Sequence, residues 1–337
     1  MKTAIFGFSG SGKTDLFAAL AGPAAAEAGN RAMVKVPDAR LDPLIELFSP
    51  KKITYSEIEY LDIPGGGGKG TGLGERVLNE VRPYDCLIGV LDAFSGMNDP
   101  KQQWDAIEAD MMVTDMAVIE KRLEKLTADK KKNAALIDPK EEAALTKALT
   151  MLEDEKPLRF NNDIADLPEL KGFKFLTARP ILYAWNCPEG EEANQKLPED
   201  TPGMTHIAVS AKLERELAEI DDPDEKAMFL EDLGITESAL DKVIASTYHL
   251  LGLISYLTAG EDECRTWPLR IGSTAPQAAG VIHTDFEKGF IRAEVIGYDD
   301  FIELGDFKAV KDAGKARLEG KEYIVQDGDI IEFRFNV

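Results

Sequence analysis

Eight residues near the N-terminus carry the clearest chemistry in this sequence, because they follow the pattern G-x-x-x-x-G-K-T from Gly7 to Thr14. A short apolar run, residues 3–6, precedes the pattern, and residues 15–20 follow it with helical spacing. In such a strand–loop–helix unit the glycines let backbone N–H groups converge on phosphate oxygens, and the helix N-terminus adds positive potential. The pattern therefore predicts a nucleoside triphosphate site. Its predicted nucleotide contacts are Gly7, Ser9, Gly10, Ser11, Gly12, Lys13, Thr14 and Asp15.

A second motif, D-x-x-G, ends an apolar-rich segment and contributes Asp62 and Gly65. In P-loop switch proteins the P-loop Lys reaches the β- and γ-phosphates, this Asp holds Mg²⁺ through water, and the Gly N–H meets the γ-phosphate. We therefore predict Mg²⁺ as the cofactor and Lys13, Asp62 and Gly65 as the catalytic set. The predicted metal ligands are Thr14, Asp62 and Ser56.

The residue after the second motif is Gly66, where Ras-like enzymes carry a catalytic Gln. Without that Gln, hydrolysis by water should be slow, at about 10⁻⁴ to 10⁻² s⁻¹ as for unstimulated switch NTPases. The glycine-rich run 65–70 favours a loop that reorganises with the γ-phosphate, and a solvated connection is the alternative. Lys69 in that run is a candidate donor of positive charge to the transition state.

A third motif, N-x-x-E, follows an apolar strand-like segment and contributes Asn186, Cys187 and Glu189. GTP-binding switch proteins have N-K-x-D here, and their Asp accepts two guanine N–H groups. A Glu, with a neutral Cys beside the Asn, weakens that guanine contact, and Asn186 could pair with the amine and N7 of adenine instead. ATP is therefore favoured as substrate, and GTP stays open. A fourth motif, S-A-K, is expected to line the base through Ser210 and Ala211.

In this order, and with N-x-x-E, the four motifs resemble the YchF / Obg-like ATPase family of translation-factor-type P-loop proteins. V-P-D-A-R-L-D at 36–42 is similar to the family's segment ahead of switch I, and G-T-G-L-G at 70–74 to its segment after switch II. Residues 283–292 and 318–329 are similar to the family's ubiquitin-like TGS domain. The resemblance implies an ATPase that also tolerates GTP and associates with ribosomes.

Three departures mark the chain as a divergent member of that family. Ser9, Gly10 and Ser11 replace the usual P-N-V, which removes an Asn that accompanies potassium-assisted hydrolysis in related proteins. Gly66 replaces the hydrophobic residue that family members carry after D-x-x-G. The usual switch I threonines are replaced around residues 54–56, so the residue that senses the γ-phosphate is left open.

Between the second and third motifs the sequence predicts an inserted helical hairpin at 103–157. Apolar residues repeat with 4-3 spacing in both halves, as in a coiled-coil seam. Asp138 followed by Pro139 predicts the start of the second helix. Two ordinary amphipathic helices packed on the body are the alternative. The seam residues are Met112, Met116, Ile119, Leu123, Leu126, Leu145, Leu149 and Leu152.

The predicted hairpin tip is basic, because residues 121–132 hold six basic and two acidic side chains. Such a charge run is either a solvated face or a contact for ribosomal RNA phosphates. We therefore expect the ribosome, through this tip and the TGS domain, to be the partner besides the nucleotide. We expect the protein itself to be a monomer.

The composition of the 337-residue chain is that of an ordinary soluble globular protein, with 44% hydrophobic and 30% charged residues. A net charge of −22 argues against a general, charge-driven nucleic-acid binder. No apolar run approaches the ~20 residues of a membrane helix, so no membrane association is expected. The start lacks a signal-peptide pattern and the three cysteines are scattered, so the expected compartment is the reducing cytoplasm.

Together these patterns predict an α/β protein with three parts. A P-loop G-domain with a mainly parallel sheet takes residues 1–102 and 158–265, the antiparallel coiled-coil hairpin takes 103–157, and a β-grasp TGS domain takes 266–337. The favoured function is a Mg²⁺-dependent ATP-hydrolysing switch of low rate. A GTP-preferring switch, a P-loop small-molecule kinase and a non-hydrolysing nucleotide-binding scaffold are the alternatives.

Overall fold

The computed structural model describes the chain except residues 67–71, 133–137, 221, 233–237 and 337. The chain folds into two compact units. Unit 1 comprises residues 1–34 and 59–250, and unit 2 comprises residues 35–58 and 251–337.

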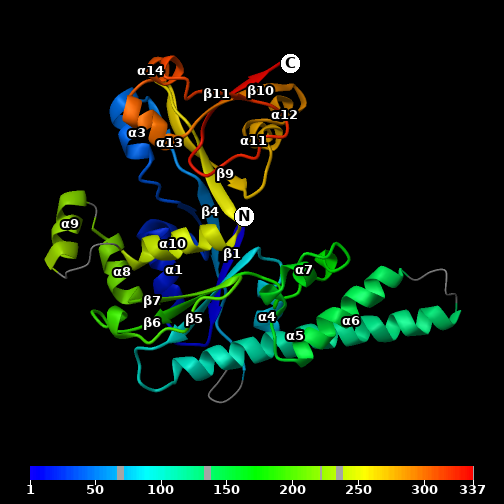
Figure 1. Cartoon of the computed structure of the whole chain (residues 1–337). Coiled ribbons are helices and arrows are strands. Elements are labelled where there is room, and N and C mark those ends of the chain that lie inside the picture. The colour runs from blue at the N-terminus through cyan, green and yellow to red at the C-terminus, as the bar shows by residue number, and fades with distance from the viewer. Residues whose placement is uncertain (67–71, 133–137, 221, 233–237, 337) are drawn as a thin grey trace. The chain divides into compact units, whose positions relative to one another are not determined.

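Unit 1 is built around a six-stranded sheet (Figure 1). Its strands, in order across the sheet, are β2 (Arg31–Lys35), β4 (Glu57–Asp62), β1 (Lys2–Gly7), β5 (Cys86–Asp92), β6 (Ile181–Asn186) and β7 (Met204–Val209). β1 pairs in parallel with β4 and β5, and β6 pairs in parallel with β5 and β7. Every residue of β5 and β6 is buried, which explains why both are nearly continuous apolar runs in the sequence.

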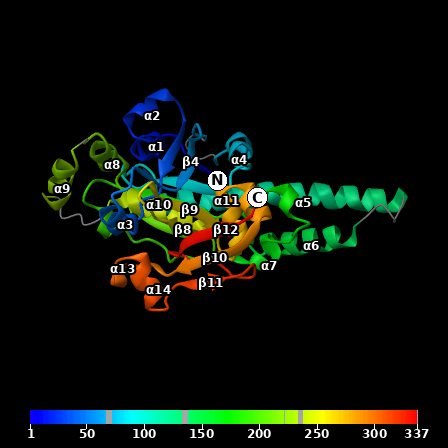
Figure 2. The ribbon, with the colours of Figure 1, turned by 90° about the horizontal axis from the view of Figure 1, so that it is seen from above.

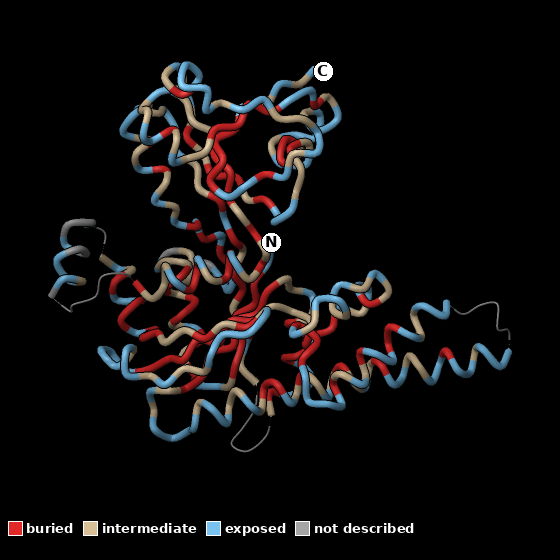
Figure 3. Tube along the Cα trace, in the orientation of Figure 1, coloured by how far each residue is buried: buried red, intermediate tan, exposed pale blue. Residues whose placement is uncertain are grey.

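Helices cover both faces of this sheet (Figure 1). One face carries α4 (Glu75–Val81) and the first part of α5 (Pro100–Lys132). The other carries α1 (Lys13–Ala21), α8 (Ala211–Ala218) and α10 (Ala239–Leu250). Figure 3 shows the buried residues concentrated along the strands between these helices. The remaining helices of unit 1 are α2 (Pro23–Ala28), α6 (Pro139–Glu153), α7 (Asn162–Ala165) and α9 (Pro223–Asp232), with 3₁₀ turns at Leu158–Phe160, Lys171–Phe173 and Glu192–Asn194.

α5 and α6 form the predicted antiparallel pair and lie side by side in both views (Figures 1 and 2). The predicted seam is confirmed, because its eight residues belong to one apolar cluster: Ile119, Leu126, Leu145 and Leu152 are buried, and the other four are partly buried against them. Asp138 caps α6 as predicted and accepts a hydrogen bond from the Lys140 N–H at 2.9 Å.

α5 begins three residues before the predicted hairpin at 103–157. It begins at Pro100 and continues unbroken for 33 residues. Ile107 and Met111 lie in the core of unit 1, whereas Ile119 and Leu126 lie in the hairpin cluster. One helix therefore serves both the body of unit 1 and the hairpin, and the predicted boundary at 103 falls inside it.

Unit 2 is built around a second six-stranded sheet. Its strands, in order, are β11 (Arg317–Glu319), β10 (Phe290–Ile296), β12 (Ile330–Phe335), β8 (Leu253–Thr258), β9 (Glu263–Arg270) and β3 (Lys52–Thr54). The sheet is mixed, with antiparallel pairs except β12 with β8 and β3 with β9. Its helices are α3 (Leu41–Phe48), α11 (Ala275–Ile282), α12 (Thr284–Lys288), α13 (Tyr298–Leu304) and α14 (Phe307–Asp312).

The boundaries of unit 2 differ from the predicted TGS domain at 266–337. β8 pairs with β9 along its whole length, from Leu253 with Arg270 to Thr258 with Arg265, so the sheet already begins before residue 266. The segment 35–58, which we had placed in the G-domain, contributes β3 to the same sheet. Pairing between strands far apart in the sequence is the reason that composition did not reveal either boundary.

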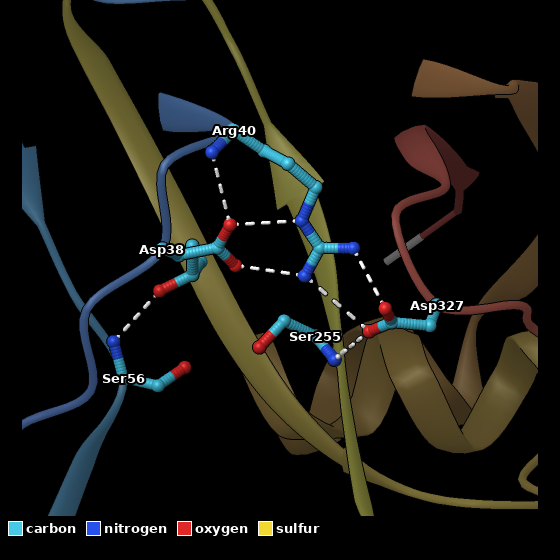
Figure 4. A network of polar contacts seen from close by, with 6 residues as sticks. Asp38, Arg40, Ser56, Ser255 and Asp327 are labelled. Atoms are coloured by element: carbon cyan, nitrogen blue, oxygen red, sulfur yellow. Dashed lines mark hydrogen bonds and ion pairs between the residues drawn. The ribbon is translucent and has the colours of Figure 1, made fainter. Parts of the chain in front are cut away.

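Arg40 ties the segment 35–58 to the C-terminal part of unit 2 (Figure 4). Its guanidinium donates to both carboxylate oxygens of Asp38 at 2.8 Å and to Asp327 at 2.7 Å. Asp327 also accepts a hydrogen bond from the Ser255 N–H at 2.8 Å. Hydrogen bonding to Asp38, and then to Asp327, raises the pKa of Arg40. The V-P-D-A-R-L-D motif therefore has a structural role in unit 2.

Candidate functional site

The predicted P-loop connects β1 to α1 in unit 1. Gly12 precedes α1 with a φ of 87°, in the left-handed region that favours glycine. A Cβ added to Gly12 would overlap the side-chain amide of Asn186. α1 begins at Lys13, so the loop leads directly into a helix N-terminus, as a phosphate site requires.

The Lys13 ammonium lies between the P-loop and the D-x-x-G motif. Its Nζ donates a hydrogen bond to the Phe8 carbonyl at 2.7 Å, and a Cβ added to Gly65 would lie 2.7 Å from the same Nζ. Burial lowers the pKa of Lys13, and the charge of Asp62 opposes that shift. A buried ammonium of this kind gains from an anion beside it, which is what a triphosphate supplies.

Thr14 and Asp62 meet on the same side of the loop. The Thr14 hydroxyl donates to Asp62 Oδ2 at 3.1 Å. Asp62 Oδ1 is buried and has no hydrogen-bond partner among the described residues. Burial raises the pKa of Asp62, while the Thr14 hydrogen bond and the Lys13 charge oppose the shift. A hydroxyl oxygen beside a carboxylate with an unsatisfied oxygen fits Mg²⁺, which prefers oxygen ligands.

Ser56, the third predicted metal ligand, belongs to unit 2. Its N–H donates to Thr266 Oγ1 at 2.7 Å, and its hydroxyl is buried with no hydrogen-bond partner in the described part of the chain. Unit 1 by itself therefore brings together Thr14 and Asp62 but not Ser56.

Gly66 leaves no room for a side chain. It forms a parallel bridge with Phe8, next to the P-loop. A Cβ added to Gly66 would overlap the Leu73 carbonyl and lie 2.6 Å from Val77 Cγ2. In this packing a Gln at position 66 would clash with the Leu73 carbonyl. Lys69, the candidate charge donor, lies outside the described residues.

Asn186 is a brace between two loops. Its Nδ2 donates to the Ser11 carbonyl at 3.0 Å, and its Oδ1 accepts from the Ala211 N–H at 3.0 Å. The side chain is only 6% exposed. Both ends of the amide are thus used inside the chain, which differs from the bidentate adenine contact that its position suggested.

The other residues expected at the base differ in their exposure. The Cys187 thiol is buried against the Val209 carbonyl at 3.6 Å, and burial raises its pKa to about 11, so it stays a neutral thiol. Glu189 is exposed in the turn after β6. Ser210 caps α8, accepting from the Leu213 N–H at 3.5 Å. Of these three residues expected at the base, Glu189 is therefore the one whose side chain faces solvent.

Asp15 forms an ion pair that the motifs did not indicate. Arg215 Nη1 on α8 donates to Asp15 Oδ1 at 2.6 Å, with both side chains nearly half exposed. The pair ties α1 to α8 beside the P-loop. Arg215 had no motif signal, because it lies one turn inside a helix that follows the S-A-K motif.

The basic hairpin tip is partly neutralised within the chain. Arg122 donates to both carboxylate oxygens of Glu141 at 2.7 and 2.9 Å, and Lys130 lies 3.1 Å from Glu142. Within residues 121–132, the exposed lysines without an ion pair to another described residue are Lys121, Lys125 and Lys131. Across the described residues, no helix combines the length and apolar composition needed to cross a membrane.

Three kinds of comparison relate the whole chain to known proteins. The family model YchF-GTPase_C, described as a protein of unknown function, matches residues 253–336. The ribosome-binding ATPase YchF of Bacillus subtilis (strain 168) is 42% identical over 365 residues, covering 99% of this chain and 98% of that protein. Obg-like ATPase 1 of Oryza sativa subsp. japonica is 38% identical over 329 residues, covering 91% and 83%. The solved structure of the Schizosaccharomyces pombe YchF GTPase matches with a TM-score of 0.87 at 32% identity, covering 99% and 97%.

Proposed function

The chain belongs to the YchF / Obg-like ATPase family, and from that premise we propose that it is a P-loop nucleoside triphosphatase that associates with the ribosome. One observation carries the proposal: in unit 1 the Lys13 ammonium, Gly65 and the Thr14–Asp62 pair meet at the P-loop. Relatives over nearly the whole chain are named ribosome-binding ATPases, which supports the second half of the proposal.

The residues of this cluster have distinct roles in the proposed reaction. The P-loop amides and Lys13 bind the β- and γ-phosphates, and Gly65 offers its N–H to the γ-phosphate. Thr14 and Asp62 would hold Mg²⁺, which would supply positive charge to neutralise the phosphates. Since Gly66 cannot carry a side chain without displacing Leu73, no residue at that position orients the attacking water, and slow intrinsic hydrolysis follows.

We propose ATP as the preferred nucleotide. An exposed Glu189 in place of the guanine-binding Asp, with a buried neutral thiol at Cys187, supports this preference. GTP is the second candidate, because the solved structural relative is named a GTPase. The proposal includes Mg²⁺ as cofactor, a monomeric state and work in the cytoplasm, where ribosomes are found.

We also propose that the hairpin tip and unit 2 form the ribosome contact. The chain as a whole is acidic and repels phosphate groups at long range. The exposed Lys121, Lys125 and Lys131 form a local basic surface, which supports a contact with RNA phosphates at the tip. Neutralising these three lysines should flatten the salt dependence of ribosome binding, and an unchanged slope would remove the tip from the proposal.

The nucleotide preference is tested by titrating ATP and GTP side by side in the presence of Mg²⁺. We expect tighter binding of ATP by the unaltered protein and a shift toward GTP in Glu189→Asp. Tighter binding of GTP by the unaltered protein would reverse the assignment.

The reaction is tested by measuring phosphate release with and without ribosomes. We expect slow release that Lys13→Ala abolishes and that ribosomes change. A non-hydrolysing scaffold would bind ATP and release no phosphate under either condition. A kinase would form ADP only with an added acceptor, to which the γ-phosphoryl group is transferred, and would release no free phosphate.

A further inference from the structure

The carboxylate of Asp110, on α5, packs against the end of the switch segment, a name that we use for the described residues 62–66 and 72–74. Asp110 Oδ2 accepts a hydrogen bond from the Leu73 N–H at 2.7 Å. A Cβ added to Gly72 would lie 2.6 Å from Oδ1 of the same carboxylate, closer than real side chains approach. Glycine at 72 therefore lets the carboxylate reach the backbone of the next residue.

The beginning of the switch segment lies on the P-loop. A Cβ added to Gly65 would lie 2.7 Å from the Lys13 Nζ, and Gly66 forms a parallel bridge with Phe8. The Leu73 carbonyl occupies the place that a Cβ on Gly66 would take. Leu73 is 1% exposed, so it contacts Gly66 through its carbonyl and Asp110 through its N–H inside a packed core.

Asp110 differs from Asp115, a second acidic residue on α5, in where its hydrogen-bond donor lies. Asp115 accepts from Arg82 at 3.0 Å, and also from the N–H and the hydroxyl of Thr177 at 2.8 and 2.9 Å. Those partners belong to unit 1 and lie outside the switch segment. The hydrogen bond that the Asp110 carboxylate accepts comes instead from the switch segment.

We infer that Asp110 is a positioning residue that holds the switch segment where the Gly65 N–H meets the γ-phosphate. In this role Asp110 acts through its hydrogen bond with the Leu73 N–H and through the packing of Leu73 against Gly66. The inference rests on the proposed function, because it presupposes a triphosphate in the P-loop. ADP has no γ-phosphate, so ADP binding depends little on the position of Gly65.

The affinities of the full-length chain for ATP and ADP, each with Mg²⁺, test this role. Removing a hydrogen bond to a charged acceptor costs about tenfold in an equilibrium constant. Asp110→Ala should therefore weaken ATP binding roughly tenfold and change ADP binding less than about twofold. Asp110→Asn keeps an oxygen acceptor for the Leu73 N–H and should restore most of the ATP affinity.

Asp105→Ala is the matched control, because Asp105 is an exposed acid on α5 that pairs with Lys101 at 3.1 Å. It should leave both affinities unchanged. Gly72→Ala should break the same Asp110–Leu73 hydrogen bond in a second way, because the added methyl group would displace the Asp110 carboxylate. Gly72→Ala should weaken ATP binding in the unaltered background and have little further effect in the Asp110→Ala background.

The outcomes separate this inference from the proposed function. If the unaltered protein fails to bind ATP, the proposed function fails first. If the unaltered protein binds ATP and Asp110→Ala keeps the ATP-to-ADP affinity ratio, the positioning role is wrong while the function stands. An equal loss for ATP and ADP, together with a lower melting temperature, would make Asp110 a structural residue only.

Discussion

The phosphate side and the base side of the nucleotide site differ in how closely the motifs describe them. On the phosphate side, Lys13, Gly65 and the Thr14–Asp62 pair meet as their spacing predicts. On the base side, Asn186 is committed to the Ser11 carbonyl and the Ala211 N–H. Phosphate motifs use the backbone of contiguous residues, so spacing alone defines the geometry. A base contact uses single side chains, which a folded chain can employ for its own packing.

The largest expected effect comes from Lys13→Ala. In the proposed function Lys13 gives charge-assisted hydrogen bonds to two phosphates, so we expect ATP affinity to fall by roughly 10³-fold in the variant. Isothermal titration calorimetry measures the loss, and Lys101→Ala, an exposed lysine paired with Asp105, is the control. A fall of less than about tenfold would mean that the phosphate side does not work as its geometry suggests.

Asn186→Ala tests the brace on the base side. It leaves the buried Ser11 carbonyl and Ala211 N–H without partners, so the free energy of unfolding should fall by about 3 kcal/mol. ATP and GTP affinities should fall by equal factors, because a brace does not read the base. Denaturant unfolding measures the stability, with Asn194→Ala, an exposed amide, as the control. Loss of ATP binding alone, with stability kept, would restore Asn186 as a base reader.

Asp62→Asn should stabilise the ligand-free protein near neutral pH. Burial raises the pKa of Asp62 in the folded state, so the folded protein holds its proton more tightly than the unfolded chain does. The resulting stability is present below the ordinary carboxyl pKa and is lost as pH rises through the raised value. The neutral amide avoids this loss but weakens the binding of Mg²⁺.

Melting temperatures measured from acidic to neutral pH test this effect of Asp62. The variant should melt higher near pH 7, and the two proteins should converge as pH falls below about 4. A variant that melts lower at neutral pH would show that the Asp62 charge stabilises the empty site.

The smallest effect is expected from the Asp15–Arg215 ion pair. Both side chains are nearly half exposed, so a double-mutant cycle of Asp15→Ala and Arg215→Ala should give a coupling of about 0.2–1 kcal/mol. The coupling should shrink at high salt. A coupling that persists in salt would show that the pair is less solvated than its exposure indicates.

The sequence predicted the elements whose signal is local. The P-loop context of Lys13 and the coiled-coil spacing from Met112 to Leu126 both depend on near neighbours along the chain. The family resemblance added the C-terminal part, and the agreement with the S. pombe structure confirms the α/β fold class.

The features that the sequence did not predict all depend on pairing between distant segments. Ser56 and Arg40 lie close to the phosphate motifs in the sequence, yet they belong to unit 2 through Thr266 and Asp327. Asp110 has no motif around it, because its role comes from a single contact with Leu73. Strand pairing and single long-range hydrogen bonds leave no periodicity that a reader of the sequence can detect.

Because α5 is one unbroken helix, a small tilt at its base produces a large displacement at the hairpin tip. From Asp110 to Lys132 the helix extends about 33 Å at 1.5 Å per residue. A tilt of about 10° about Asp110 would displace the far end by about 6 Å, more than the 5.4 Å pitch of one helical turn. A tilt of that size would therefore move the exposed Lys131 and Lys132, at the far end of α5, by the length of a full helical turn.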